Sequence, residues 1–572
     1  MEYSAIFHDM DKRFSYAVDK DLFVIRVQVK KDDMKEVILH YEDKYIPMER
    51  KDTRMTLPMK KVATSQFHDY YEAQLQMHLI CLRYFFEFTD MQGEKVYYGN
   101  YEFDKECITN RDRMFDCPQN LREEEMFEVP QWAANKVVYQ IFPSRFAATQ
   151  PVDKKLWYKA PITPMDDLHG NLRGIIEHLD YIKDLGIDVV YLTPIFKSNS
   201  CHKYDTIDYY QVDPSFGTTE DLKELVQKSH ERGMKVVLDA VYNHSGREFF
   251  AFQDILEKGE KSKYLDWYFI DELPPKSEWG EIPNFKCFGY YGGMPKLNLK
   301  NPEVEKYITD VACYWIKECD IDGWRLDVGD EISHFFWKNF RKAVKAVKKD
   351  MLIIGEIWHY AGDFLEGDEW DTVMNYPFYL NLIDLLADEK ITVSQFVQNL
   401  GYLKGRLHKN CYPLMWNLID SHDTARFLHL CNDNKKKQHL AAAFQLLLPG
   451  MPMIYYGDEY AMPGANDPDC RRGMYWDEEY QDKEMYEWYK RLIQVRKSHA
   501  CIVEGELAGS VTEDEEGTVV LIRKNDEETI AMIFNCSSSA KKFNEYTQKY
   551  NLLTENTFDG NVEGFDAAVI VL

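Results

Sequence analysis

The sequence predicts an α/β protein built around an eight-stranded (β/α)8 TIM barrel. At 572 residues the chain is too long for one domain of ordinary size. In its middle part, short and continuously apolar segments alternate with helix-length segments, which is typical of parallel strands buried on both faces. Near both ends, apolar residues recur at every second position, as in antiparallel strands. The predicted domains are 1–120 (N-terminal β-sandwich), 121–245 with 301–498 (barrel), 246–300 (insertion domain after barrel strand three) and 499–572 (C-terminal β-sandwich).

The N-terminal β-sandwich is predicted from period-two apolar runs that turn residues interrupt. We expect its strands within residues 21–30, 36–41, 70–77, 82–90 and 95–103.

Eight apolar segments supply the barrel strands, and each is followed by a polar or helix-length stretch. An open doubly wound sheet is the alternative, but it would need a glycine-rich phosphate turn after the first strand, and the sequence has none there. In chain order the segments are VVYQIFP (137–143), DVVYLTP (188–194), KVVLDAVYNH (235–244), GWRLDV (323–328), LIIGEIW (352–358), TVMNYP (372–377), LMWNLIDSHD (414–423) and MPMIYYGDE (451–459).

Helices are predicted between these strands from apolar spacing and from start and stop signals. Residues 171–186 and 218–233 each end on a glycine, and residues 301–318 begin with Asn-Pro-Glu. About 55 residues, 246–300, stand where one helix and a short loop would suffice, and an insertion of that length is usually functional. After residue 498 alternating strands return, so a small second sandwich closes the chain.

Composition narrows the classes of partner. The net charge of −27 would repel a phosphate backbone or an anionic lipid surface, so we expect no nucleic-acid or membrane partner and a neutral substrate. No apolar run is long enough to span a membrane, and the first residues carry no apolar core of a secretory signal. The 12 cysteines show no CxxC spacing, which favours reduced thiols and a cytoplasmic location.

Polar side chains gather at the carboxyl ends of four predicted strands, where barrel enzymes carry their catalytic groups. A single aspartate at such a position more often caps a helix or pairs with a neighbour, but four strand ends meeting at one mouth are a stronger signal. The candidates are Asp239, Asn243 and His244 after strand three, Arg325 and Asp327 on strand four, Glu356 and Trp358 after strand five, His422 and Asp423 after strand seven, and Tyr204 in the loop after strand two.

These residue types suit the cleavage of a glycosidic bond, which uses one nucleophilic and one proton-donating carboxyl group. Arg325 and Asp327 are two residues apart on a strand and point the same way, so the guanidinium would keep Asp327 ionised. Glu356 stands between Ile354 and Ile357, where loss of water would favour its protonated form. No HExxH or His/Cys metal set is present. Acidic residues this far apart in the sequence do not by themselves identify a Mg²⁺ or Ca²⁺ site.

The strand-end motifs carry a resemblance. DAVYNH (239–244), GWRLDVGDE (323–331), GEIWH (355–359) and DSHD (420–423) resemble the four short regions of the α-amylase family of glycoside hydrolases. Residues 202–217 and MPKLN (294–298) are similar to the cyclomaltodextrinase, neopullulanase and maltogenic amylase group, whose members also begin with a sandwich of this size.

The resemblance implies a retaining attack on α-1,4 glucosidic bonds of α-glucan oligosaccharides and cyclodextrins. It implies a starch-binding-like N-terminal sandwich that packs over a partner subunit's site in a homodimer. Carried over to matching positions, the roles are nucleophile for Asp327, acid/base for Glu356, transition-state stabiliser for Asp423, sugar binding for Arg325, His244, His422, Trp358 and Tyr204, and structural support for Asp239 and Asn243.

Two features depart from the group or stay unassigned. Members usually read Val-Ala-Asn-Glu after the nucleophile, whereas this chain has Gly329 and Asp330 there, which adds a negative charge near the acceptor subsites. The segment 468–477 keeps the family's arginines without an evident role.

Two alternatives stay open. A non-catalytic amylase-like protein that binds glucan or serves a transporter would lose catalytic carboxyls or gain a membrane anchor, and this chain shows neither change. A transferase would form the same glucosyl-enzyme and pass it to a sugar instead of water.

Calcium binding is predicted to be absent, and no other cofactor is expected. Many relatives carry an Asn/Asp-rich calcium loop after the first strand, whereas this chain reads FAATQPVDKKLW (146–157) and later His169-Gly170-Asn171 in place of Gly-Gly-Asp. Fewer acidic oxygen ligands weaken a site for a hard cation. We therefore expect a chelator to leave the Tm unchanged in calorimetry, and a fall of more than a few degrees would contradict this.

Overall fold

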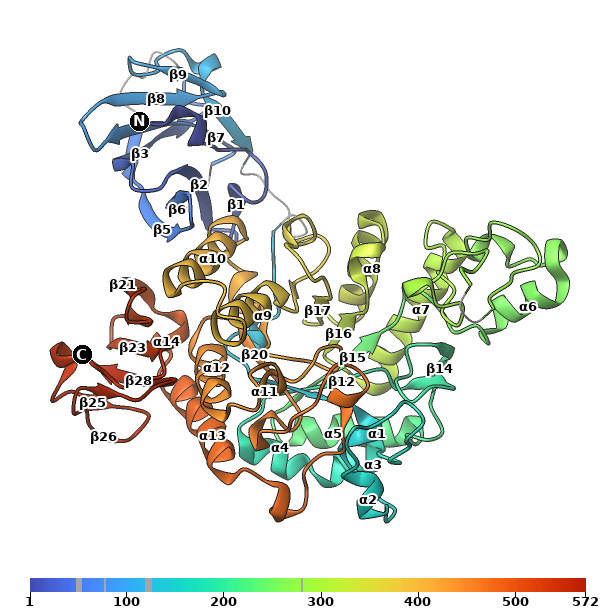
Figure 1. Ribbon diagram of the computed structural model, residues 1–572. Helices are drawn as coiled ribbons and strands as arrows, with labels where there is room; N and C mark the ends of the chain where they lie inside the picture. Colours follow the sequence, from blue (N-terminus) through green and yellow to red (C-terminus); the bar gives the residue numbers. More distant parts are fainter. Residues whose placement is uncertain (48–53, 77–78, 119–125, 279–280) are drawn as a thin grey trace. The chain divides into compact units, whose positions relative to one another are not determined.

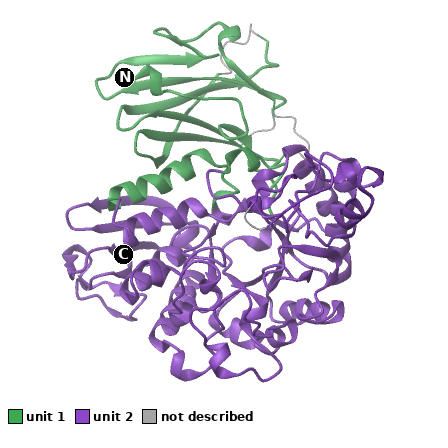
Figure 2. Cartoon of the chain, turned by 45° about the vertical axis from the view of Figure 1, so that its right-hand side comes forward, with its two compact units in different colours: residues 1–129, 361–371, 391–412 green, residues 130–360, 372–390, 413–572 purple. Residues whose placement is uncertain are grey.

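The computed structural model describes residues 1–572 except 48–53, 77–78, 119–125 and 279–280 (Figure 1). The chain divides into two compact units, coloured separately in Figure 2. The predicted boundary at residue 120 and the end of the strand expected over 70–77 lie outside the described residues, and the four-domain division stays a prediction. The units are 1–129 with 361–371 and 391–412, and 130–360 with 372–390 and 413–572.

The second unit contains the predicted barrel, and each of the eight predicted segments contributes one strand. Neighbouring strands pair in parallel, and a bridge between Met374 and Trp416 joins the two end strands and closes the ring. The (β/α)8 fold is therefore confirmed. In sheet order the strands are β18 (Thr372–Val373), β17 (Leu352–Gly355), β16 (Gly323–Leu326), β15 (Lys235–Ala240), β12 (Val189–Leu192), β11 (Val138–Ile141), β20 (Met451–Tyr455) and β19 (Trp416–Asn417).

The helices between the strands begin and end largely where the sequence signals lie. Helix α5 (Thr219–Glu231) begins with a capping box between Thr218 and Asp221, and Asn301 caps α7 (Pro302–Cys319). The others in this unit are α1 (Pro143–Phe146), α2 (Lys154–Trp157), α3 (Leu172–Glu177), α4 (Leu179–Leu185), α6 (Phe250–Lys258), α8 (His334–Val347), α9 (Tyr376–Leu382), α11 (Phe427–Leu430), α12 (Lys435–Leu447), α13 (Lys483–Ser498) and α14 (Cys501–Glu504).

The single helix predicted over 171–186 is two helices, α3 and α4. The ring of His178 hydrogen-bonds the Gly174 carbonyl at 2.7 Å, so it takes the acceptor that the backbone N–H of His178 would use in a continuous helix. That N–H donates to the Ile175 carbonyl instead, and α3 ends there. Gly186 stops α4 in a left-handed conformation with φ 101°, as its position predicted.

The first unit holds the N-terminal strands in two antiparallel sheets. A cluster of apolar side chains that includes Val27, Leu39, Tyr84 and Phe86 forms its core. Helix α10 (Val393–Arg406) belongs to this unit and contacts β5, which the sequence did not indicate. One sheet has β1 (Ser15–Ala17), β2 (Leu22–Lys30), β5 (Lys60–Thr64) and β6 (His68–Gln76), and the other has β3 (Met34–Asp43), β4 (Met55–Pro58), β7 (Cys81–Asp90), β8 (Lys95–Gly99), β9 (Glu102–Asp104) and β10 (Phe115–Pro118).

The second unit also contains a small sheet that periodicity did not predict and the C-terminal strands that it did. A two-stranded sheet of β13 (Phe196–Ser198) and β14 (Thr206–Val212) follows barrel strand β12 and carries the loop with Tyr204. The C-terminal sheets contain β21 (Glu506–Glu513), β22 (Thr518–Lys524), β23 (Thr529–Asn535), β24 (Lys541–Lys542), β25 (Tyr550–Asn551), β26 (Asn556–Thr557), β27 (Asn561–Val562) and β28 (Asp566–Val571). Within the described ranges, no helix has both the length and the apolar character needed to cross a bilayer.

Candidate active site

The carboxyl ends of the barrel strands surround a cavity of about 390 Å³, and most of the predicted site residues meet there. Six of the residues predicted from the sequence line it: Tyr204, His244, Asp327, Glu356, Trp358 and Asp423. Four others, Asp239, Asn243, Arg325 and His422, are buried and are not among its lining residues. The lining also contains His202, Phe288, Met294, Val328, Asp467 and Arg471, which were not among the predicted site residues.

Arg325 is the buried charge that holds the carboxylates in place. Its Nη1 lies 3.0 Å from Asp239 Oδ2 and 3.0 Å from Asp327 Oδ1, and its Nη2 lies 2.8 Å from Glu356 Oε2. The planar guanidinium has several N–H groups in fixed directions, so one side chain can hold three carboxylates at set angles. This explains why a charged residue points inward from the apolar strand β16.

Arg325 favours the ionised form of Asp327, as expected, but it does not outweigh the effects that oppose it. Burial raises the pKa of Asp327 well above its ordinary value, because its charged form loses contact with water. Arg325 opposes this shift, but the neighbouring carboxylates Glu356, Asp239 and Asp423 add to it. Asp327 and Asp239 therefore hold a proton more tightly than isolated aspartates would.

Glu356 has more polar surroundings than its sequence neighbours indicated. Besides Arg325, the backbone N–H of Val328 donates to Oε2 at 2.9 Å and the indole N–H of Trp358 donates to Oε1 at 3.2 Å. Val328 has φ 48°, a left-handed conformation that is costly for a β-branched residue and often marks a functional turn. The Trp358 ring stacks on Tyr376 at 4.0 Å and is 43% exposed, so one part of it is free for contact with a ligand.

Asp423 is held by the arginine whose role the sequence left open. Arg471 Nη2 lies 3.3 Å from Asp423 Oδ1, and its Nε–H donates to the His422 carbonyl at 2.8 Å. Arg471 also pairs with Asp467 at 2.7 Å, which lines the cavity. His422 Nε2 lies 3.1 Å from the other carboxylate oxygen of Asp423. Segment 468–477 therefore fixes the position of one of the three predicted carboxylates.

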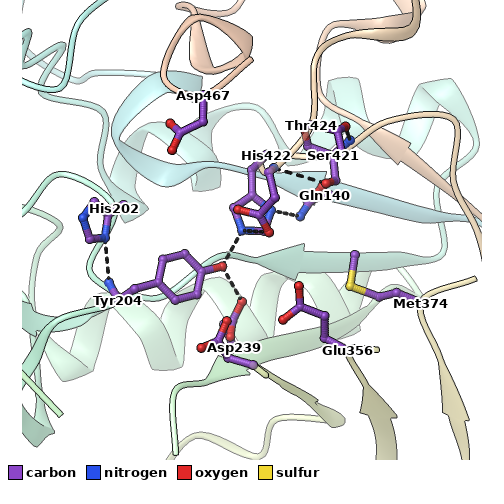
Figure 3. Close-up of polar contacts among 12 residues, drawn as sticks. Gln140, His202, Tyr204, Asp239, Glu356, Met374, Ser421, His422, Thr424 and Asp467 are labelled. Carbon is purple, nitrogen blue, oxygen red and sulfur yellow. Dashed lines mark hydrogen bonds and ion pairs between the residues drawn. The ribbon is translucent and has the colours of Figure 1, made fainter. Parts of the chain in front are cut away.

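A hydrogen-bonded network crosses the mouth of the barrel, as Figure 3 shows for four of its members. The Tyr204 hydroxyl bonds His422 Nε2 and Asp239 Oδ2, the latter at 3.1 Å, and the Tyr191 hydroxyl donates to the same Asp239 oxygen at 2.6 Å. Gln140 Nε2 lies 2.8 Å from His422 Nδ1. Sequence reasoning missed Gln140 and Tyr191, although Gln140 is a polar residue inside an otherwise apolar strand, which was the available signal.

His244 and Asn243 leave the same strand and have different surroundings. The His244 ring stacks against Phe288 at 5.2 Å, and burial lowers its pKa to about 3, so it is neutral at ordinary pH. The Asn243 amide donates to Glu331 Oε2 at 3.0 Å, and its carbonyl accepts from Lys296. These contacts fit the structural role predicted for Asn243.

Residues near the position where many relatives carry a calcium loop form hydrogen bonds and close polar contacts with their own neighbours in this chain. The Asn171 carbonyl caps helix α3 by accepting from the Gly174 N–H, and Asp167 lies 3.1 Å from the His169 ring. In the part of the chain that the structure describes, no group of three or more His, Cys, Asp or Glu side chains could hold a metal ion.

This combination of fold and site defines a class. Asp327 and Glu356 are held by one arginine on a cavity at the carboxyl end of a (β/α)8 barrel, and Asp423 completes the acidic lining. Paired carboxyl groups around one cavity are the apparatus of a glycoside hydrolase.

Comparisons with known proteins give the family. The α-amylase catalytic-domain model matches residues 140–505, and the model of the family's N-terminal immunoglobulin-like domain matches residues 1–119. The chain belongs to the α-amylase family of glycoside hydrolases, as its motifs predicted.

Similar proteins extend the match over most of the chain. A cyclomaltodextrinase of Geobacillus thermopakistaniensis is 43% identical over 544 residues, which cover 94% of this chain and 92% of that protein. An intracellular maltogenic amylase of Bacillus subtilis is 38% identical, with 94% and 91% covered. A solved cyclomaltodextrinase structure superposes with a TM-score of 0.94 at 38% identity and full coverage of both chains.

Asp239 gives the site a measurable pH dependence. Burial raises its pKa to about 6, against the opposing effect of Arg325. The folded state therefore binds this proton more tightly than the unfolded chain, and stability falls as the pH rises from about 4 to 6. Relative to Asp239→Asn, which has no such group, we expect the wild type to lose up to about 3 kcal/mol of unfolding free energy across that window. Urea denaturation at several pH values measures this difference.

Asp213→Asn is the matched control, because Asp213 is a buried aspartate with the opposite shift. Burial alone would raise its pKa, but hydrogen bonds from Ser215 and Ser198 and the ammonium of Lys203 outweigh burial and lower it. Its contribution to stability is complete above about pH 4, so the difference between wild type and this variant stays flat up to pH 7. Equal slopes for the two variants would contradict the assignment to Asp239.

Proposed function

We propose that the protein is a retaining α-glucan hydrolase in which Asp327 is the nucleophile and Glu356 is the acid/base. One observation carries this assignment: two nitrogens of the Arg325 guanidinium hold these two carboxyl groups on one cavity. A shared guanidinium keeps the groups close together, and a short separation is what distinguishes retaining from inverting glycosidases.

The reaction proceeds in two displacements. Asp327 attacks the anomeric carbon and forms a glucosyl ester, while Glu356 gives its proton to the glycosidic oxygen that leaves. Glu356, now a carboxylate, takes a proton from water, and the water oxygen attacks the same carbon and releases Asp327. The backbone N–H of Val328 and the indole N–H of Trp358 donate to Glu356 and hold its carboxyl group in place.

The remaining predicted residues would bind the sugar at the point of cleavage. Asp423 and His422 would bind hydroxyl groups of the distorted ring, and the Tyr204 and His244 rings would form walls of the cavity. Arg325 is buried behind the carboxylates, so we assign it the positioning of Asp327 and Glu356 rather than direct contact with sugar.

For substrates we propose cyclodextrins, pullulan and malto-oligosaccharides, cleaved at α-1,4 bonds with α-1,6 bonds as a second class. The name of the 43% identical relative, cyclomaltodextrinase, supports the cyclic substrates. Transfer of the glucosyl group to a sugar uses the same intermediate. A non-catalytic glucan-binding role is disfavoured, because such a protein would have no use for three clustered carboxylates that are costly to bury.

Turnover of β-cyclodextrin, pullulan and soluble starch, measured side by side, tests the proposal. We expect hydrolysis with α-anomeric products, a cyclodextrin-to-starch ratio above one, and a loss of kcat on the order of 10⁴-fold or more in Asp327→Asn. Asp213→Asn replaces a buried aspartate outside the cavity and should keep its activity. Full activity in Asp327→Asn, or β-anomeric products, would overturn the roles.

We further propose that the protein is a cytoplasmic homodimer. The name of the 38% identical relative, intracellular maltogenic amylase, supports the location. The matched N-terminal domain supports the dimer, because in the group that the motifs resemble this domain packs over a partner's site.

The dimer makes a prediction about substrate choice. If the N-terminal sandwich of one subunit narrows the site of the other, dilution to the monomer should lower activity on cyclodextrin relative to starch. Light scattering and activity across a concentration series measure both quantities. A monomer that keeps its full activity on cyclodextrin would defeat the proposal.

A further inference from the structure

Gln140 is a polar side chain in the buried wall of the barrel. It lies in β11 between Tyr139 and Ile141 and has no exposed surface. Its side-chain carbonyl has no hydrogen-bond partner within the part of the chain that the structure describes. A buried amide with one unsatisfied atom costs free energy. The contact that its N–H group makes must therefore explain why a glutamine stands here. That N–H group faces His422 Nδ1 at 2.8 Å (Figure 3).

The other ring nitrogen of His422 must carry a proton. Two acceptors face Nε2: one is Asp423 Oδ2 at 3.1 Å, and the other is the Tyr204 hydroxyl oxygen. Tyr204 gives its own proton to Asp239 at 3.1 Å, so it can only accept from the ring. A ring nitrogen without a proton would place its lone pair against both oxygens, and both bonds would be lost.

The ring nevertheless stays neutral. Burial, together with the positive charges of Arg471 and Arg325, holds the pKa of His422 well below its ordinary value. A neutral imidazole has one proton, and here that proton is on Nε2, so Nδ1 must accept a hydrogen bond. Only the amide nitrogen end of Gln140 can donate to it, which leaves the Gln140 carbonyl unpaired.

We propose that Gln140 is a positioning residue that fixes His422 as the neutral tautomer with its proton on Nε2. His422 Nε2 then donates permanently to Asp423 and the Tyr204 hydroxyl, whose residues line the cavity, without adding a positive charge next to an oxocarbenium-like transition state. This assignment rests on the proposed glucan hydrolysis for its catalytic consequence, but the tautomer itself is a property of the free protein.

Three variants of the full-length protein separate this role from a structural one. Gln140→Glu keeps the shape and replaces the donor with a carboxylate that accepts a proton from Nδ1, and Gln140→Leu removes the donor. Gln438→Leu is the matched control. Gln438 lies in helix α12 and is also buried, but its amide donates to the Asp458 carbonyl and not to His422. Gln140→Leu and Gln438→Leu each lose a buried hydrogen bond, Gln140→Glu reverses the direction of one, and only the two Gln140 variants change the surroundings of Nδ1.

The first readout is the ring itself, observed by nitrogen NMR of histidine-labelled protein, with His422→Asn used to assign the signal. In the wild type we expect a neutral ring protonated at Nε2, and in Gln140→Glu a ring protonated at Nδ1. A wild-type ring that carries its proton on Nδ1, or that is charged at neutral pH, would overturn the proposal. This measurement needs no substrate.

The second readout is kinetics on β-cyclodextrin. We expect kcat to fall on the order of 10²-fold in both Gln140 variants with a smaller change in KM, since one preorganised donor is lost. In Gln140→Glu the loss should be smaller at low pH, because the added carboxylate favours the charged ring, in which Nε2 regains its proton. A loss of the same size in Gln438→Leu, or an unchanged Gln140→Glu, would overturn the role. If the wild type cleaves no glucan, the proposed function fails while the NMR result still decides the tautomer.

Discussion

The mouth of the barrel depends on one buried guanidinium. Arg325 has no exposed surface, and its Nη1 and Nη2 atoms contact Asp239, Asp327 and Glu356, which come from three neighbouring strands. Without it, these acidic groups would repel one another at short range in surroundings that hold little water. The position of each carboxylate is therefore set by the directions of the arginine N–H groups as well as by its own strand. Neighbouring parallel strands bring these residues together because their carboxyl ends share one edge of the sheet.

Such a site lowers the stability of the folded protein, and packing elsewhere in the barrel must compensate for it. Asp327 Oδ2 is buried without a hydrogen-bond partner in the described part of the chain, and Val328 holds a left-handed backbone conformation. An unsatisfied oxygen and a strained turn next to each other indicate groups held ready for a ligand rather than for folding. The rest of the barrel supplies the compensating free energy through strands that are buried along their whole length, such as β11, β12 and β20.

The sequence predicted the barrel and half of the residues that line the cavity, because strand periodicity and strand-end polarity are local signals. It did not predict that α10 groups with the N-terminal strands, since that contact joins residues more than 300 positions apart. It also missed Gln140 and Tyr191, whose partners His422 and Asp239 come from other strands. The surroundings of Glu356 were expected to be apolar because Ile354 and Ile357 are its neighbours in sequence. An ion pair with Arg325 and hydrogen bonds from Val328 and Trp358 make these surroundings polar, and the apolar pattern of the strand does not predict any of the three contacts.

Asp330, at which this chain departs from the usual sequence of the group, has defined partners in this network. Asp330 Oδ2 lies 3.5 Å from His359 Nε2, so the two loops that follow β16 and β17 approach each other there as well as at the Val328–Glu356 hydrogen bond. Burial raises the pKa of Asp330, and His359 opposes that shift, so the added negative charge is partly balanced within the site. Asp330 follows Val328 by two residues in the loop that donates to Glu356, so the position that departs from the group's sequence belongs to the turn that holds one of the cavity carboxylates.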